Sequence, residues 1–126
     1  MEETPGSTPL VADDAMSTVV AEAERVAPRR PFDRCRGASD RLIRALIRKG
    51  IDARMIGGRG HLVDRPSADR RWLALHRRSW THYAVHVPSL DVVVDPTWRQ
   101  FDVEGDRVRI LDARTFNAEW SEAVDA

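Results

Sequence analysis

Three residues in this chain combine side chains that can carry out nucleophilic catalysis. Cys35 is the single cysteine among 126 residues, and His82 and Asp95 lie close together further along the chain. A thiol that gives its proton to a histidine can attack the carbonyl carbon of an amide, and a carboxylate can hold that histidine in the required tautomer. We therefore predict a catalytic site with Cys35 as nucleophile, His82 as base and Asp95 as the residue that orients His82.

Residues 80–97 are predicted to form a β-hairpin that brings His82 and Asp95 together. The first half has the alternation of a strand, and the second half is rich in valine. A two-residue loop would place the two side chains directly opposite each other. A four-residue loop at 88–91 would make them diagonal neighbours on one face of the hairpin. A three-residue loop would turn Asp95 to the other face, away from His82. Because Pro88 cannot take the positive φ of a two-residue turn, we favour the four-residue loop. A purely structural His–Asp pair is the alternative interpretation.

A second predicted helix places Cys35 where a thiolate would be stabilised. It opens in the segment 32–35 and runs to Lys49, with Asp33 as a candidate N-cap and Gly50 as a candidate left-handed C-terminal cap. The first turn of a helix carries partial positive charge and free N–H groups, and two arginines flank the cysteine. The same N–H groups could hold a developing oxyanion. The alternative is that the cysteine is a small buried apolar residue.

The remaining segments predict an α+β chain with helices packed on a mainly antiparallel sheet. Residues 1–11 are expected to form a tail without fixed structure, and 12–126 a single domain. The further predicted elements are a helix from Asp13 or Asp14 to about Ala27, a strand 51–56 ended by Gly57 and Gly58, a loop holding His61, a strand 71–76, a strand within 103–111 with a turn at 104–106, and a helix capped by Asp112 that contains Phe116, Trp120 and Val124.

Charge is segregated along the chain although the formal net charge is zero. Residues 1–24 hold six acids and no bases, residues 25–78 hold 16 bases and five acids, and residues 79–126 hold four bases and nine acids. No segment has the ~20 apolar residues of a membrane span, and the polar, acidic start is unlike a signal peptide. A lone cysteine excludes an internal disulfide and favours a reducing compartment. We therefore expect a cytoplasmic protein with no membrane partner.

From Cys35 to Phe101 the chain resembles the transglutaminase-like branch of the papain-like cysteine enzymes. The resemblance rests on the helix headed by Cys35, the segment 50–57 behind it, His82 at a strand start, and the run Val-Asp-Pro-Thr at 94–97. The segment 95–101 is also similar to the one that follows the aspartate in small bacterial papain-fold domains, including toxin-associated ones suspected of glutamine deamidation. The resemblance implies a papain-like fold and a Cys-His-Asp triad formed by Cys35, His82 and Asp95.

Other candidate site residues flank the predicted triad. Trp80 and Trp98 could line a substrate groove, and Gln100 could orient a substrate or the triad. No cofactor or metal is predicted, since His82 and His86 would lie roughly 13 Å apart along a strand.

The sequence thus predicts an enzyme that transfers acyl groups from an amide of a protein or peptide through a Cys35 thioester. Glutamine deamidation, amide or peptide hydrolysis and transglutamination all fit. The alternatives are an inactive interaction module of the same fold, or an anion- or nucleic-acid-binding protein that uses the arginine-rich segment 25–78. Nucleic acid is the less favoured partner.

Overall fold

The computed structural model describes residues 12–29, 34–61, 79–100 and 105–120. The described part contains three helices and a four-stranded antiparallel sheet in the order β1-β2-β3-β4, which confirms the predicted α+β class. The elements are α1 (Ala12–Val26), α2 (Cys35–Arg48), β1 (Arg54–His61), β2 (Ser79–Val87), the 3-10 turn η2 (Pro88–Leu90), β3 (Val92–Asp95), the 3-10 turn η3 (Trp98–Gln100), β4 (Arg109–Leu111) and α4 (Ala113–Glu119).

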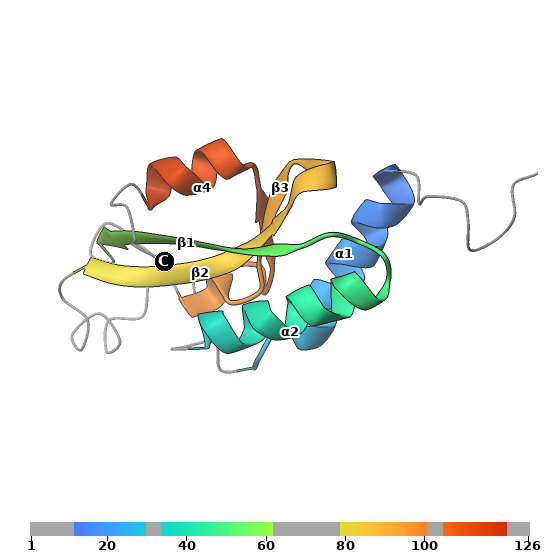
Figure 1. The fold of residues 1–126 in the computed structure, drawn as a ribbon. Helices are drawn as coiled ribbons and strands as arrows, with labels where there is room; N and C mark the ends of the chain where they lie inside the picture. The colour runs from blue at the N-terminus through green and yellow to red at the C-terminus, as the bar shows by residue number, and fades with distance from the viewer. Residues whose placement is uncertain (1–11, 30–33, 62–78, 101–104, 121–126) are drawn as a thin grey trace, which may run out of the picture.

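The sheet separates two layers of helix: α1 and α2 lie on one face and α4 lies on the other (Figure 1). Alternate side chains of the central strands enter the two layers, as the period of a strand requires. Val85 and Val94 pack in the core with α1 and α2. Ala84 and Val93 pack in a smaller core with residues from α4 and its C-cap. The sheet is thus buried on both faces at the β2–β3 pair.

The hairpin between β2 and β3 has the predicted four-residue loop. Val87 pairs with Val92, and Val85 pairs with Val94. Asp91 closes the loop in the left-handed region with φ 53, and its N–H donates to the Pro88 carbonyl at 3.1 Å. Continuing this register puts Asp95 across from the residue two positions after His82, so the two are diagonal neighbours on one face, as predicted.

Strand β1 differs from the prediction, because it begins at Arg54 and runs through both glycines to His61. It pairs with β2 along its whole length, with Gly58 opposite His82. The glycine does not end the strand. A Cβ at Gly58 would lie 2.4 Å from Trp120 Cβ and 2.7 Å from its carbonyl oxygen, so only glycine allows this close approach. His61 accordingly belongs to a strand and not to a loop.

The helix ends agree with the sequence at some positions and not at others. Gly50 has φ 78, the expected left-handed conformation, and Asp112 caps α4 by accepting from the Thr115 N–H at 2.6 Å. The proposed caps of the first helix are wrong, because α1 already includes Asp13 and Asp14. Helix α2 begins at Cys35, with Arg34 as an N-cap that makes no side-chain hydrogen bond.

Helix α4 ends at Glu119, so that Trp120 is its C-cap residue rather than an interior one. The strand predicted within 103–111 is shorter than expected, and β4 covers only Arg109–Leu111. The predicted tail 1–11, the cap Asp33, the strand 71–76 and Val124 lie outside the described residues.

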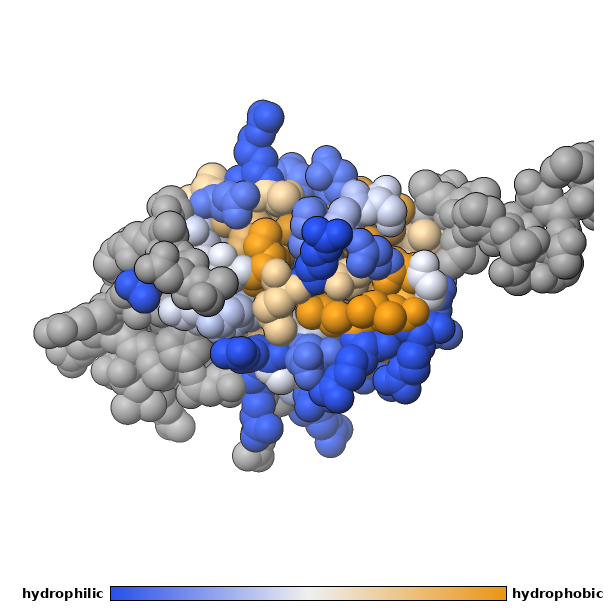
Figure 2. Space-filling model, viewed as in Figure 1, coloured by the Kyte–Doolittle hydropathy of each residue, from blue (hydrophilic) through white to orange (hydrophobic). Residues whose placement is uncertain are grey.

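The outer side of α2 is strongly hydrophilic. Figure 2 shows hydrophilic side chains along this helix and apolar side chains gathered between it and the sheet. Arg41, Arg44 and Arg48 are exposed there, whereas Leu42 and Leu46 are fully buried. This is the amphipathic pattern expected from the sequence. In the ranges that the structure describes, no helix is both long and apolar enough to span a membrane.

Candidate active site

His82 and Asp95 form a buried pair at the end of the β2–β3 hairpin. His82 Nε2 lies 2.6 Å from Asp95 Oδ2, and the exposed fractions of the two residues are 0% and 2%. This confirms the predicted contact. An ionised carboxylate can only accept a hydrogen bond, so Nε2 carries the shared proton and Nδ1 is left to face another partner.

Asp95 is held by the turn that follows it. Its Oδ1 accepts from the Thr97 N–H at 3.0 Å and from the Thr97 hydroxyl at 3.2 Å. Both carboxylate oxygens therefore have partners, and the carboxyl group has a single orientation. Thr97 was not predicted as a site residue, although an Asp followed two positions later by a residue with a backbone N–H and a hydroxyl is the signal of an Asx-turn.

Gln100 continues the same network. Its Nε2 donates to the Thr97 hydroxyl at 2.9 Å and lies 3.5 Å from His82 Nδ1. Because the Thr97 hydroxyl uses its single proton toward Asp95, it must accept from Gln100, and this fixes the orientation of the amide. Gln100 Oε1 is then buried without a hydrogen-bond partner among the described residues. Gln100 thus lies beside the His–Asp pair, and its predicted role in orienting a substrate or the triad stays a prediction.

Cys35 reaches His82 from the first position of α2. The side chain is 5% exposed, and its thiol lies close enough to the His82 ring to help raise the pKa of that imidazole. Helix α2 is fixed against β2 next to this contact, because the Ser39 hydroxyl lies 3.4 Å from the Tyr83 carbonyl and the Arg36 guanidinium lies 5.4 Å from the centre of the Tyr83 ring. Since Asp95 occupies Nε2, the ring nitrogen available to the thiol is Nδ1.

The surroundings of His82 favour its charged form. Burial lowers the pKa of the imidazole, but the charge of Asp95, the hydrogen bond to Asp95 and the interaction with Cys35 raise it more, to a net value of about 9. At neutral pH the imidazolium form of His82 is therefore favoured. Such a ring can stabilise a thiolate and can also give up a proton.

Aromatic side chains form the wall behind His82. The ring centres of Trp120 and Phe116 lie 4.7 Å and 6.1 Å from that of His82. The sequence indicated these residues only as part of a helix. Trp98 is partly buried against the same core, and the Arg109 guanidinium lies 4.1 Å from the centre of its ring. The side chain of Trp80 lies outside the described part, so its predicted role in a substrate groove stays a prediction.

No family model matches the chain, and the searches of curated proteins and of solved structures find no match either. Among the described residues, no three His, Cys, Asp or Glu side chains are grouped closely enough to hold a metal ion. The functional interpretation therefore rests on the hydrogen-bond network itself.

Proposed function

We propose that this chain is a cysteine-dependent acyltransferase or hydrolase of the papain-like, transglutaminase-like type, with an amide as substrate. The observation that carries the proposal is the buried His82 imidazole between the Asp95 carboxylate and the Cys35 thiol. A structural His–Asp pair has no need of a thiol on its other nitrogen. A buried titratable group with a perturbed pKa and a nucleophile beside it is typical of a catalytic site.

The reaction follows from the proton positions. The reactive form is the pair of a Cys35 thiolate and a His82 imidazolium, which forms when the neutral ring takes the proton of the thiol. The thiolate attacks the carbonyl carbon of the amide to form a C–S bond and a tetrahedral oxyanion. The His82 imidazolium then protonates the nitrogen, the C–N bond breaks, and ammonia or an amine leaves a thioester on Cys35. Water or an amine attacks the carbonyl carbon of this thioester while His82 takes its proton. The C–S bond then breaks, the carboxylic acid or the new amide leaves, and His82 returns its proton to the sulfur.

The start of α2 offers groups that suit the oxyanion. The first described hydrogen bond of the helical ladder runs from the Ala38 N–H to the Arg34 carbonyl at 2.9 Å. The N–H groups of residues 35–37 therefore lie outside the ladder and near the nucleophile. Donors placed where negative charge develops stabilise the transition state.

The test uses glutamine-containing peptides and a matched pair of variants. Wild type is expected to release ammonia or an amine and to form a thioester visible by intact mass. Cys35→Ala should lose both signals, and His82→Ala should be nearly as damaging because it removes the proposed base. His86→Gln, a change on the same strand outside the network, should keep activity. Turnover that persists in Cys35→Ala would exclude the thioester mechanism.

A second candidate function is an interaction module that has kept the fold without catalysis. The observation that favours it is the burial of the nucleophile, because Cys35 is only 5% exposed and His82 is fully buried. The two candidates differ in thiol reactivity. An active site should be alkylated by iodoacetamide faster than a model thiol at neutral pH, whereas an inactive module should react no faster than one.

A further inference from the structure

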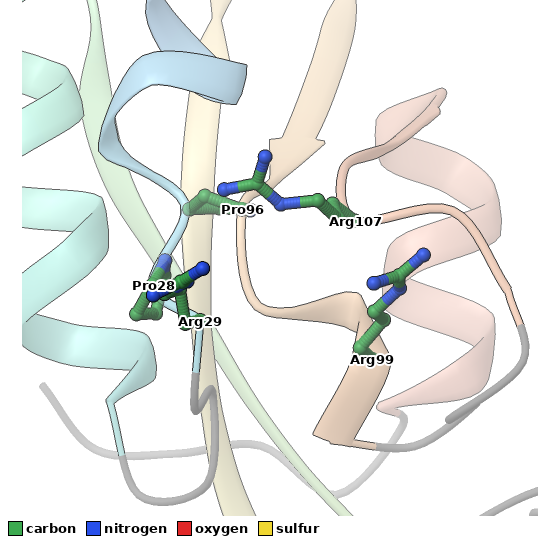
Figure 3. Close-up of a pocket in the computed structure, with 5 residues that line it drawn as sticks. All are labelled: Pro28, Arg29, Pro96, Arg99 and Arg107. Carbon is green, nitrogen blue, oxygen red and sulfur yellow. The ribbon is translucent and has the colours of Figure 1, made fainter.

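A cavity of about 320 Å³ lies on the outer side of the turn that follows Asp95. It is formed by three segments that are distant in sequence: the residues after α1, the turn leading into η3, and the segment before β4 (Figure 3). Its lining residues are Pro28, Arg29, Pro96, Arg99 and Arg107. The charged residues in the described part of the lining are all arginines, which makes this part of the cavity positive.

Two of the arginines are held in place by backbone carbonyls. Arg107 donates to the Ala27 carbonyl at 2.8 Å, and Arg99 Nε donates to the Gly105 carbonyl at 2.8 Å. A guanidinium has five N–H donors, so these bonds orient the side chains and leave donors for a ligand. The Arg107 bond also ties the segment before β4 to the end of α1. Figure 3 shows the three guanidinium groups around a common space.

Among the described lining residues of the cavity there is no acid to balance this charge. Asp106 and Glu24 line a neighbouring cavity of about 410 Å³ together with Arg99 and Arg107, but they do not line this one. Within the described ranges, no ion pair joins an acid to any of the three arginines. Three exposed like charges around one space repel each other, and a bound anion would relieve that repulsion.

We propose that this cavity binds a phosphate group, either as inorganic phosphate or as a phosphate monoester. Arginine forks match the oxygens of phosphate and carboxylate. Forks from three separate segments suit a tetrahedral group, which presents oxygens in several directions, better than a planar carboxylate with two. This proposal does not depend on the enzymatic activity proposed above.

Binding there would also affect the turn that holds the candidate active site. Pro96 and Arg99 line the cavity, while their neighbours Thr97 and Gln100 are buried in the network around Asp95. A phosphate held by Arg29 and Arg99 would link α1 to this turn. We therefore expect bound phosphate to raise the unfolding temperature as well as to give a binding isotherm.

The test is a titration with inorganic phosphate at constant ionic strength, followed by calorimetry and thermal unfolding. We expect saturation at or below roughly 10 mM, because a weaker effect would not differ from general screening. Arg29→Gln is the main variant, since no described hydrogen bond of Arg29 supports the fold. It should raise the dissociation constant by at least about tenfold. Arg41→Gln, which removes an exposed arginine from α2, should leave the constant unchanged.

Parallel titrations with phenyl phosphate and with a phosphoserine peptide identify the source of the phosphate group. The proposal is supported if wild type binds any of the three ligands more tightly than Arg29→Gln does. The ligand that wild type binds most tightly is then the preferred form of the phosphate group. Equal binding by wild type and Arg29→Gln for all three ligands would overturn the proposal. So would stabilisation by chloride equal to that by phosphate.

Discussion

The charge on His82 makes a quantitative prediction about stability and pH. The pKa of this imidazole is raised from 6.5 to about 9 in the folded chain, so the folded state binds a proton that the unfolded state releases. The resulting stabilisation is fully present below pH 6.5 and is lost as pH rises through about 9. Replacing Asp95 with Asn removes the charge that opposes burial. In that variant, burial should lower the pKa of His82 below 6.5.

The magnitude follows from the size of the shift. One pKa unit corresponds to about 1.4 kcal/mol, so the shift of His82 is worth up to about 3 kcal/mol between pH 6.5 and 9. Cys35 also contributes to the raised pKa of His82. The measurement should therefore be made in a Cys35→Ala background, where the contribution from Asp95 remains.

The assay is urea unfolding of Cys35→Ala at several pH values from 6 to 10, together with an NMR titration of the His82 ring. We expect the free energy of unfolding to fall by up to about 3 kcal/mol across this range. The decline should be absent when Asp95→Asn is added, and it should persist with His86→Gln. A His82 ring that titrates at or below 6.5 in Cys35→Ala, or an unfolding free energy that stays flat, would refute the reasoning.

Two further changes test the packing around the network. Thr97→Val should lower the free energy of unfolding by about 1–3 kcal/mol, because it removes one of the donors to Asp95 and leaves a buried amide unpaired. Thr97→Ser keeps the hydroxyl and should restore most of the lost stability. Equal unfolding curves for the two variants would contradict the role of the hydroxyl. Gly58→Ala should cost about 1–3 kcal/mol or more, because its Cβ would meet Trp120 at 2.4 Å. Gly37→Ala is the control, because no atom lies within 4 Å of the added Cβ, and it should stabilise α2 by about 0.5–1 kcal/mol. The unfolding temperatures of the two glycine variants should therefore shift in opposite directions. Shifts of the same sign would count against the packing argument.

The sequence predicted the parts of the site that depend on local geometry. The φ restriction of Pro88 was enough to choose the hairpin loop, and strand alternation then placed His82 and Asp95 on one face. The predicted start of the second helix in the segment 32–35 placed Cys35 in a first turn. These inferences need only the chain's own neighbours along the sequence.

The features that the sequence did not predict depend on contacts between distant segments. Two consecutive glycines indicate a turn locally, but Gly58 lies inside a strand because Trp120 approaches it closely in the folded chain. The stacking of Trp120 near His82 has the same origin. Asp13 and Asp14 are good capping residues in isolation, yet α1 begins before them. The local conformational preference of a residue determines neither which distant segments meet in the folded chain nor the residue at which a helix begins.

The candidate site is divided between a hairpin and a separate helix, and this division determines when its residues come together during folding. His82 and Asp95 are 13 positions apart and belong to adjacent strands, so their pairing closes only a short loop and can form early. Cys35 belongs to a helix that precedes β1, and it meets His82 only when α2 docks on the sheet. During synthesis the cysteine emerges before the hairpin, and until docking it is an ordinary thiol. Under the proposed mechanism, Cys35 would therefore become a nucleophile only once the tertiary structure is complete.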